Sequence, residues 1–248
     1  GFHWWSWRLC CTLRHEILLN VTPLETRVAV VEEGLLQEIL IERARQLGLV
    51  GNIYLGKVAR VLPGMQACFV DVGLERCAFL HVKDVPVADI DSKSLIQTLV
   101  TEGQDLLVQV IKDPVGNKGA RLTAEVSLAG RHLVLMPFVS HIGISKRIED
   151  KCTRDHLKSI VKKALASQSL DCGVIVRTAG DGHTAEDFER DLDYLKRVWD
   201  DIRKEQKEAK SPALIFEELP LTHRLIRDQI RRDTIRVWID SLETFNRL

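Results

Sequence analysis

Two phenylalanines, Phe69 and Phe79, stand where their rings could bind nucleic-acid bases. Residues 51–81 are predicted to form three short strands joined by tight turns. Because side chains alternate across a strand, both rings fall on the more polar face of their strands. An aromatic ring on the solvent side of a small barrel can stack on a base, which contributes about 1–3 kcal/mol per base.

A second interpretation of these rings stays open, because phenylalanine in a hairpin usually belongs to the core. Two observations favour binding: the rings share a polar face on adjacent strands, and Lys57 and Arg60 lie nearby in the first strand. Lys57 is therefore a candidate nucleic-acid contact as well. The pattern is typical of a five-stranded barrel of the oligonucleotide-binding type.

A candidate phosphate site follows a predicted buried strand, Gly173–Val176. The strand runs into Arg177 and Thr178, then a glycine-rich loop, then a helix for which Thr184 is a candidate N-cap, with Asp187 three residues on. Ligands of α/β units lie at the carboxyl ends of strands, and loop amides and a helix N-terminus attract anions. Arg177 can hold a phosphate by two parallel hydrogen bonds, to which Thr178 adds a hydroxyl. Alternatively, Arg177 forms a surface ion pair and the glycines serve only turns.

Three more basic residues could extend these surfaces. Lys146 and Arg147 form a basic pair after Gly143, and Lys118 lies in a loop between two predicted barrel strands. An exposed lysine or arginine is by default only solvated. These residues therefore count as RNA contacts only if they lie near the aromatic rings or the phosphate loop.

A search for catalytic groups assigns no catalytic and no metal-binding residue. Asp89 and Asp91 lie in a polar insertion, and Asp71 has no second carboxylate at strand spacing. The eight histidines form no H-x-x-x-H motif and no triad-like set. No paired carboxylates indicate a two-metal centre.

The composition narrows the class of protein. Lys+Arg and Asp+Glu both number 35, so the net charge is zero and any RNA-binding surface must be a local patch. The six cysteines include no C-x-x-C pair, which indicates a reducing, cytoplasmic environment and neither a disulfide scaffold nor a zinc site. There is no run of eighteen apolar residues, so we expect no membrane span.

The first fifteen residues differ from the rest. They carry three of the five tryptophans, and Arg8 and Arg14 interrupt their apolar run. No small-residue cleavage site is clear, so the segment does not fit a signal peptide. We expect a tail that is foreign to the fold, and a membrane-interface anchor is the alternative.

The elements around these sites predict a mixed α/β (α+β) chain. Strands are expected over 16–20, 26–33, 35–42, 105–112, 119–126, 132–136, 143–145, 213–217 and 235–238, and helices over 92–100, 150–167, 184–207 and 219–229, with another helix starting at the end. A sheet, then a barrel, then an α/β unit and then more sheet is the order expected of a domain interrupted by insertions.

These motifs resemble the bacterial ribonuclease E/G family from about residue 16 to residue 248. The resemblance rests on long motifs in the same order: residues 19–29, 52–80, 109–123, 127–130, 133–137, 143–149 and 176–180. It implies a split RNase H-like subdomain formed by residues 16–50 and 211–248. An S1 domain of the OB-fold type (51–126) and an α/β 5′-sensor unit (127–210) would be inserted, and residues 1–15 match nothing.

The resemblance also implies roles for individual residues. Phe69, Phe79 and Lys118 match RNA contacts of the S1 domain. Arg177 and Thr178 match a pocket for a 5′-monophosphate, with Val134 lining it, and Lys146 and Arg147 stand where the family has basic residues. Leu55 stands where the family often has lysine, which removes one possible phosphate contact.

The family's implied activity is Mg²⁺-dependent endonucleolytic cleavage of single-stranded RNA, in ribosomal and messenger RNA processing, with preference for a 5′-monophosphate. Its metal-binding aspartates, and the cysteine motif that shares zinc between subunits of its homo-oligomers, come after this point of the sequence. We therefore expect an RNA-binding N-terminal portion that binds RNA without cleaving it, and holds neither Mg²⁺ nor Zn²⁺. A non-catalytic S1-type RNA-binding module and a truncated gene product are the alternatives.

Overall fold

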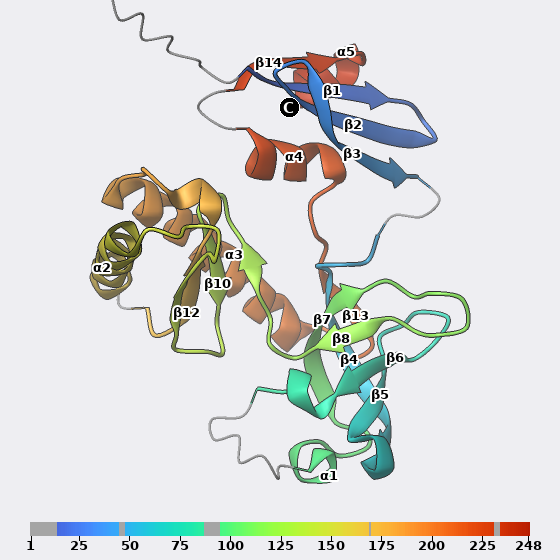
Figure 1. Cartoon of the computed structure of the whole chain (residues 1–248). Helices are drawn as coiled ribbons and strands as arrows, with labels where there is room; N and C mark the ends of the chain where they lie inside the picture. Colours follow the sequence, from blue (N-terminus) through green and yellow to red (C-terminus); the bar gives the residue numbers. More distant parts are fainter. Residues whose placement is uncertain (1–13, 45–47, 87–94, 169, 231–233) are drawn as a thin grey trace, which may run out of the picture. The chain divides into compact units, whose positions relative to one another are not determined.

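The structure, a computed structural model, describes residues 14–44, 48–86, 95–168, 170–230 and 234–248 (Figure 1). The chain forms two compact units, one made of Gly1–Leu47 with Leu219–Leu248 and the other of Gly48–Glu218. The predicted tail lies outside the described residues except for Arg14 and His15. His15 begins the first strand and is buried, so the fold starts inside the segment that we expected to be foreign.

The smaller unit is a four-stranded sheet in the order β14-β1-β2-β3. Its strands are β1 (His15–Val21), β2 (Glu25–Glu32), β3 (Leu35–Arg43) and β14 (Thr234–Ile239), and its helices are α4 (Leu221–Gln229) and α5 (Leu242–Arg247). The β1 strand pairs parallel with β14, so segments far apart in sequence share one sheet. Alternation along β1 buries Ile17 and Leu19, which pack with Leu225 of α4.

A closed barrel of five strands forms one part of the larger unit. The strands β4 (Ile53–Leu62), β5 (Ala67–Asp71), β6 (Ala78–His81), β8 (Arg121–Thr123) and β7 (Asp105–Lys112) pair in that order, and β4 also pairs with β7, which closes the barrel. Three short helices belong to it, η1 (Pro63–Met65), η2 (Val82–Asp84) and α1 (Ile96–Leu99). The predicted helix over 92–100 is thus shorter, and residues 92–94 of it lie outside the described residues. A Cβ at Gly56 would lie 2.5 Å from a methyl carbon of Val70, so glycine lets β4 and β5 approach closely.

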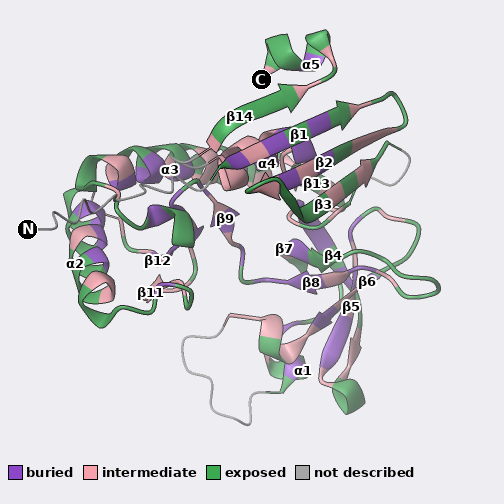
Figure 2. Ribbon diagram, turned by 45° about the horizontal axis from the view of Figure 1, so that its top comes forward, coloured by how far each residue is buried: buried purple, intermediate pink, exposed green. Residues whose placement is uncertain are grey.

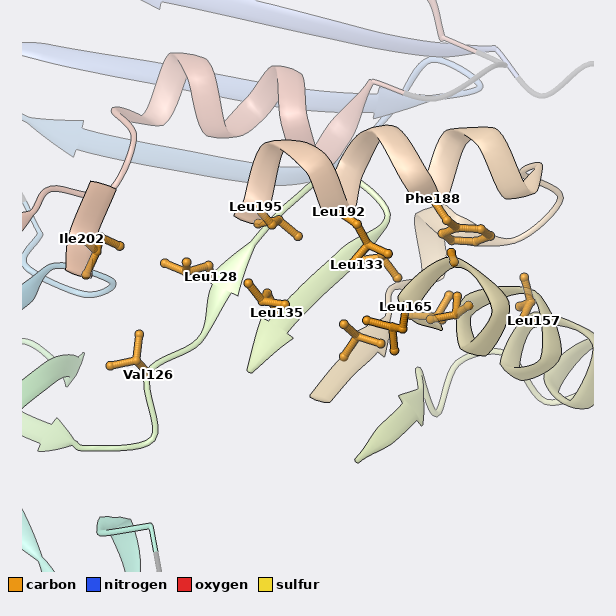
Figure 3. Close-up of a cluster of buried hydrophobic side chains, with 14 of the residues drawn as sticks. Val126, Leu128, Leu133, Leu135, Leu157, Leu165, Phe188, Leu192, Leu195 and Ile202 are labelled. Carbon is orange, nitrogen blue, oxygen red and sulfur yellow. The ribbon is translucent and has the colours of Figure 1, made fainter. Parts of the chain in front are cut away.

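The α/β part of the larger unit has a sheet in the order β11-β12-β10-β9. It comprises β9 (Leu128–Ala129), β10 (Leu133–Met136), β11 (Ile142–Ile144), β12 (Gly173–Val176), η3 (Thr178–Gly180), α2 (Lys151–Ser167) and α3 (Ala185–Glu208). Apolar side chains at helical spacing give α2 one buried and one exposed side (Figure 2). Phe188, Leu192 and Leu195 of α3 pack with β10 and α2 in one core (Figure 3).

Strand β13 (Ala213–Phe216) differs from the sequence prediction, which grouped residues 211–248 with the first sheet. It pairs antiparallel with β4 and lies in the larger unit. Ile215 and Phe216 pack against the core of the α/β part, and the Glu218 amide donates to Asn52 Oδ1 at 2.9 Å. The physical reason is that β5 pairs with β4 only from Lys57 onward, so residues 53–55 of β4 have backbone groups free to pair with a further strand. The RNase H-like identity of the first sheet and the predicted domain boundaries remain predictions.

Candidate nucleic-acid interface and phosphate loop

Phe69 and Phe79 are direct partners across the β5–β6 ladder. Their ring centroids lie 6.2 Å apart with an interplanar angle of 67°. The flanking residues Cys68, Val70 and Leu80 are fully buried, while both rings are half-buried on the outer face. Alternation along the strands therefore predicted the direction of these rings. Their edge contact makes a continuous aromatic surface of the kind on which bases stack.

Three further side chains accompany the rings: Arg60, which the sequence pattern placed nearby, and His81 and Arg121, which it did not assign. His81 extends the aromatic row, with its ring centroid 6.4 Å from that of Phe79. Its Nδ1 accepts a hydrogen bond from the Lys83 amide at 3.2 Å, so in the neutral ring Nε2 carries the proton. Arg60 is the partner of Phe69 on β4. Arg121 is the partner of Phe79 on β8 and forms an ion pair with Asp84 at 3.0 Å.

The two predicted lysine contacts of the barrel lie in different surroundings. Lys57 is exposed on the β4–β5 ladder that also carries Phe69, with Nζ 4.0 Å from Asp105. This exposed ion pair reduces the positive charge that Lys57 offers. Lys118 is exposed in the loop between β7 and β8, where a bridge between Val115 and Lys118 closes a tight turn. The structure therefore brings Lys57 to the ladder of the aromatic rings and places Lys118 on a separate loop.

Arg177 stands at the end of β12, as the sequence predicted, and is half-buried. Its amide donates to the His132 carbonyl at 2.8 Å, and its Nη1 donates to the Gly130 carbonyl at 2.6 Å. This hydrogen bond orients the guanidinium. Val134 is half-buried on the adjacent β10 and is the partner of Ile175 on β12.

Thr178 is exposed and lies beside the turn that carries the predicted basic pair. Its hydroxyl oxygen is 3.0 Å from Ser145 Oγ, directly before Lys146 and Arg147, which are both exposed. Arg154 of α2 fixes this turn, since its guanidinium donates to the carbonyls of residues 144, 145 and 148. Thr178 thus lies beside the turn with the basic pair, at the neighbouring ends of β11 and β12, and Arg177 precedes it in the chain. We call Arg177, Thr178 and this turn the phosphate loop.

The N-terminus of α3 begins as the sequence predicted, at Thr184. Thr184 is its N-cap, and its hydroxyl accepts from the Asp187 amide while the Asp187 carboxylate accepts from the Thr184 amide, a capping box. The hydrogen bond from the Thr184 amide, with further ones from His183 and Thr184 side chains, lowers the pKa of Asp187 to about 2. A carboxylate of the chain therefore lies at this helix end. Arg177 and Thr178 remain the candidate anion-binding groups of the loop.

His132 contacts the glycine-rich segment that follows Thr178. Its side chain is buried, its Nδ1 lies 3.2 Å from the Ala179 carbonyl oxygen, and its ring centroid is 4.0 Å from that of His183. Burial first, and then the charge of His183, lower the pKa of His132. A neutral ring can donate from Nδ1 to the Ala179 carbonyl, which holds the glycine-rich segment against β10.

A metal site needs a cluster of ligating His, Cys, Asp or Glu side chains. Within the described ranges, no group of three or more His, Cys, Asp or Glu side chains is placed to hold a metal ion. In the same part of the chain, no helix is long and apolar enough to cross a membrane.

The closed barrel is of the oligonucleotide-binding, S1-like class. Comparison with known proteins identifies the protein family. The model of the ribonuclease E/G family matches residues 127–248 of this chain. Ribonuclease G of Salmonella typhimurium is 47% identical over 242 residues, which cover 94% of this chain and 49% of that protein. Ribonuclease G of Escherichia coli K12 is 46% identical over the same shares. The chain belongs to the ribonuclease E/G family.

More distant similarity agrees with this family. Ribonuclease E of a Nostoc species is 35% identical over 215 residues, or 86% of this chain and 31% of that protein. The chain spans about half the length of the ribonuclease G proteins that it matches. Among solved structures, the RNase P protein of Staphylococcus aureus matches 29% of this chain and 79% of its own with 19% identity, but the TM-score of 0.25 is too low to indicate a shared fold.

Proposed function

We propose that this chain captures single-stranded RNA and recognises its 5′-monophosphate, as the RNA-binding portion of an endoribonuclease. The observation that carries the proposal is the Phe69–Phe79 pair, two outward rings in register on a barrel that lies within the stretch similar to ribonuclease G. Single-stranded RNA exposes base faces, whereas a duplex keeps them stacked inside. A surface that offers rings is therefore suited to single strands.

The phosphate loop supports the more specific part of the proposal. A 5′-monophosphate carries a charge of about −1.5 to −2 at neutral pH, more than an internal phosphodiester. Arg177 offers a planar fork that its bond to Gly130 orients, and Thr178 offers an exposed hydroxyl. Lys146 and Arg147 add positive charge on the neighbouring turn. A 5′-hydroxyl end lacks the oxygens that these groups would bind.

Cleavage belongs to our proposal for the longer family protein. It would cut single-stranded ribosomal and messenger RNA with Mg²⁺, in the cytoplasm, as a homo-oligomer that shares zinc. The described residues include no group of three or more His, Cys, Asp or Glu side chains placed to hold a metal ion, and the role that we propose for them is RNA capture and recognition of the 5′ end. Incubation of the chain with Mg²⁺ and a 5′-monophosphorylated oligonucleotide should leave the RNA intact, and specific cut products would overturn this division of roles.

The change Arg177→Ala tests recognition of the 5′ end. Fluorescence anisotropy would measure binding of two single-stranded RNAs of the same sequence, one with a 5′-monophosphate and one with a 5′-hydroxyl. Loss of a charge-assisted contact of about 1.5–3 kcal/mol predicts about ten- to 150-fold weaker binding of the phosphorylated RNA. Binding of the hydroxyl RNA should hardly change. Equal losses for both RNAs would show that Arg177 is structural.

A matched control removes the same charge elsewhere. Arg203 is exposed on α3, so Arg203→Ala tests whether overall charge alone affects binding. We expect this variant to keep the preference for the 5′-monophosphate. If both arginine variants lose the preference to the same extent, the effect is one of general charge and not of the loop.

A further inference from the structure

We propose that Asp191 is a positioning residue of the phosphate loop: its buried carboxylate fixes the turn whose carbonyl orients Arg177. The inference rests on the proposed function, because it deepens the account of how Arg177 binds a 5′-phosphate. Asp191 lies on α3, 58 to 60 residues after the turn that its carboxylate contacts, and carries no signal in the sequence pattern.

The contacts of Asp191 are unusually concentrated. It is a carboxylate only 9% exposed, and both its oxygens face the turn between β9 and β10. Oδ1 accepts from the Arg131 amide at 3.0 Å, and Oδ2 accepts from the amides of His132 and Leu133, each at 2.8 Å. Three successive backbone N–H groups that converge on one anion form a nest, and such bonds are strengthened by the charge. The carboxylate thus sets the conformation of residues 131–133.

Gly130 connects this nest to Arg177. A Cβ at position 130 would lie 2.6 Å from each Asp191 oxygen, so glycine is needed for the carboxylate to come this close. The Gly130 carbonyl accepts from Arg177 Nη1 at 2.6 Å, and the His132 carbonyl accepts from the Arg177 amide at 2.8 Å. The turn that Asp191 holds therefore fixes both the backbone and the side chain of Arg177.

The sign of the expected effect separates positioning from electrostatics. Asp191 is negatively charged, so removing its charge should by itself strengthen the binding of a phosphate nearby. Loss of positioning should do the reverse, because a turn without its anion no longer holds the Gly130 carbonyl in place. Asp191→Asn keeps the size of the side chain but replaces an acceptor by an NH₂ group that faces amide donors.

The test compares Asp191→Asn with the wild-type chain and with Asp200→Asn, which neutralises an exposed aspartate on the same helix. The readout is the ratio of anisotropy affinities for the 5′-monophosphate and 5′-hydroxyl RNAs. We expect Asp191→Asn to lower this ratio about three- to tenfold with hydroxyl-RNA affinity unchanged, and Asp200→Asn to leave the ratio unchanged. An unchanged or higher ratio in a folded Asp191→Asn variant overturns the inference. A wild-type chain without any preference overturns the proposed function instead.

Gly130→Ala disturbs the same contact between the turn and Asp191, because the added methyl group would clash with the carboxylate. If Asp191→Asn does not fold, a folded Gly130→Ala variant should show the same selective loss. A normal ratio in that variant contradicts the inference. Loss of the fold in both variants also contradicts it, because Asp191 would then hold the whole unit and not the pocket.

Discussion

Neighbouring residues on β6 should respond in opposite ways to truncation. Phe79 is half-buried on the outer face of the barrel, and its ring contacts those of Phe69 and His81. Leu80, the next residue, is fully buried in the barrel core. Phe79→Ala should therefore weaken RNA binding with little loss of stability, whereas Leu80→Ala should do the reverse.

The magnitudes follow from these positions. Removal of the Phe79 ring removes one stacking surface, which predicts a loss of about 1–3 kcal/mol, or roughly five- to 150-fold in Kd. Its effect on stability should be about 1 kcal/mol, because chiefly the edge contact with another ring is lost. Leu80→Ala removes core packing and should cost about 2–5 kcal/mol of the free energy of unfolding.

The assay combines urea unfolding with anisotropy on a 5′-hydroxyl RNA, which isolates the barrel from the phosphate loop. For Leu80→Ala we expect normal affinity once the folded fraction is taken into account. If Phe79→Ala loses as much stability as Leu80→Ala and unfolding explains its weaker binding, Phe79 is a core residue. The stacking interpretation would then be wrong.

Three further predictions address other parts of the account. Arg154→Leu should release the turn that carries Lys146, because three backbone carbonyls lose their hydrogen-bond donor. We expect several-fold weaker binding of 5′-monophosphate RNA in fluorescence anisotropy. Full affinity in this variant would contradict the role of the turn. The pKa of Asp187 is lowered from 3.8 to about 2, so its bonds stabilise the fold above about pH 4 and are lost as the pH falls toward 2. Asp187→Asn should accordingly flatten the pH dependence of urea unfolding in this window, and an unaltered profile would show that the capping box does not contribute. Lys118→Ala should reduce the salt dependence of log Kd by about 0.7 if Lys118 contacts a phosphate, and an unchanged slope would remove it from the interface.

Local patterns predicted much of the fold and part of the candidate site. Alternation along β5 and β6 predicted that Phe69 and Phe79 face outward, because their neighbours are apolar and buried. The Thr184-x-x-Asp187 spacing predicted the helix start. The same spacing predicted the capping box, which places the chain's own carboxylate at that helix end.

The sequence patterns could not predict which distant segments of the chain contact one another. Arg121 reaches Phe79 through a parallel β6–β8 pair, and β13 joins β4 across some 160 residues of sequence. Asp191 bonds amides that precede it by 58 to 60 residues. Periodicity reports which face of an element is buried, but not which other element covers it, so such partners need the folded structure.

The most direct test of the account is a map of backbone amide chemical shifts during titration with short single-stranded RNAs that differ only at the 5′ end. With the 5′-monophosphate RNA we expect changes on the outer face of β5 and β6, around Phe69 and Phe79, and at Arg177 and Thr178. With the 5′-hydroxyl RNA only the barrel changes should remain. Changes that avoid both places, or that are the same at Arg177 for both RNAs, would contradict the claim that this chain binds RNA on the barrel and reads the 5′-phosphate at the loop.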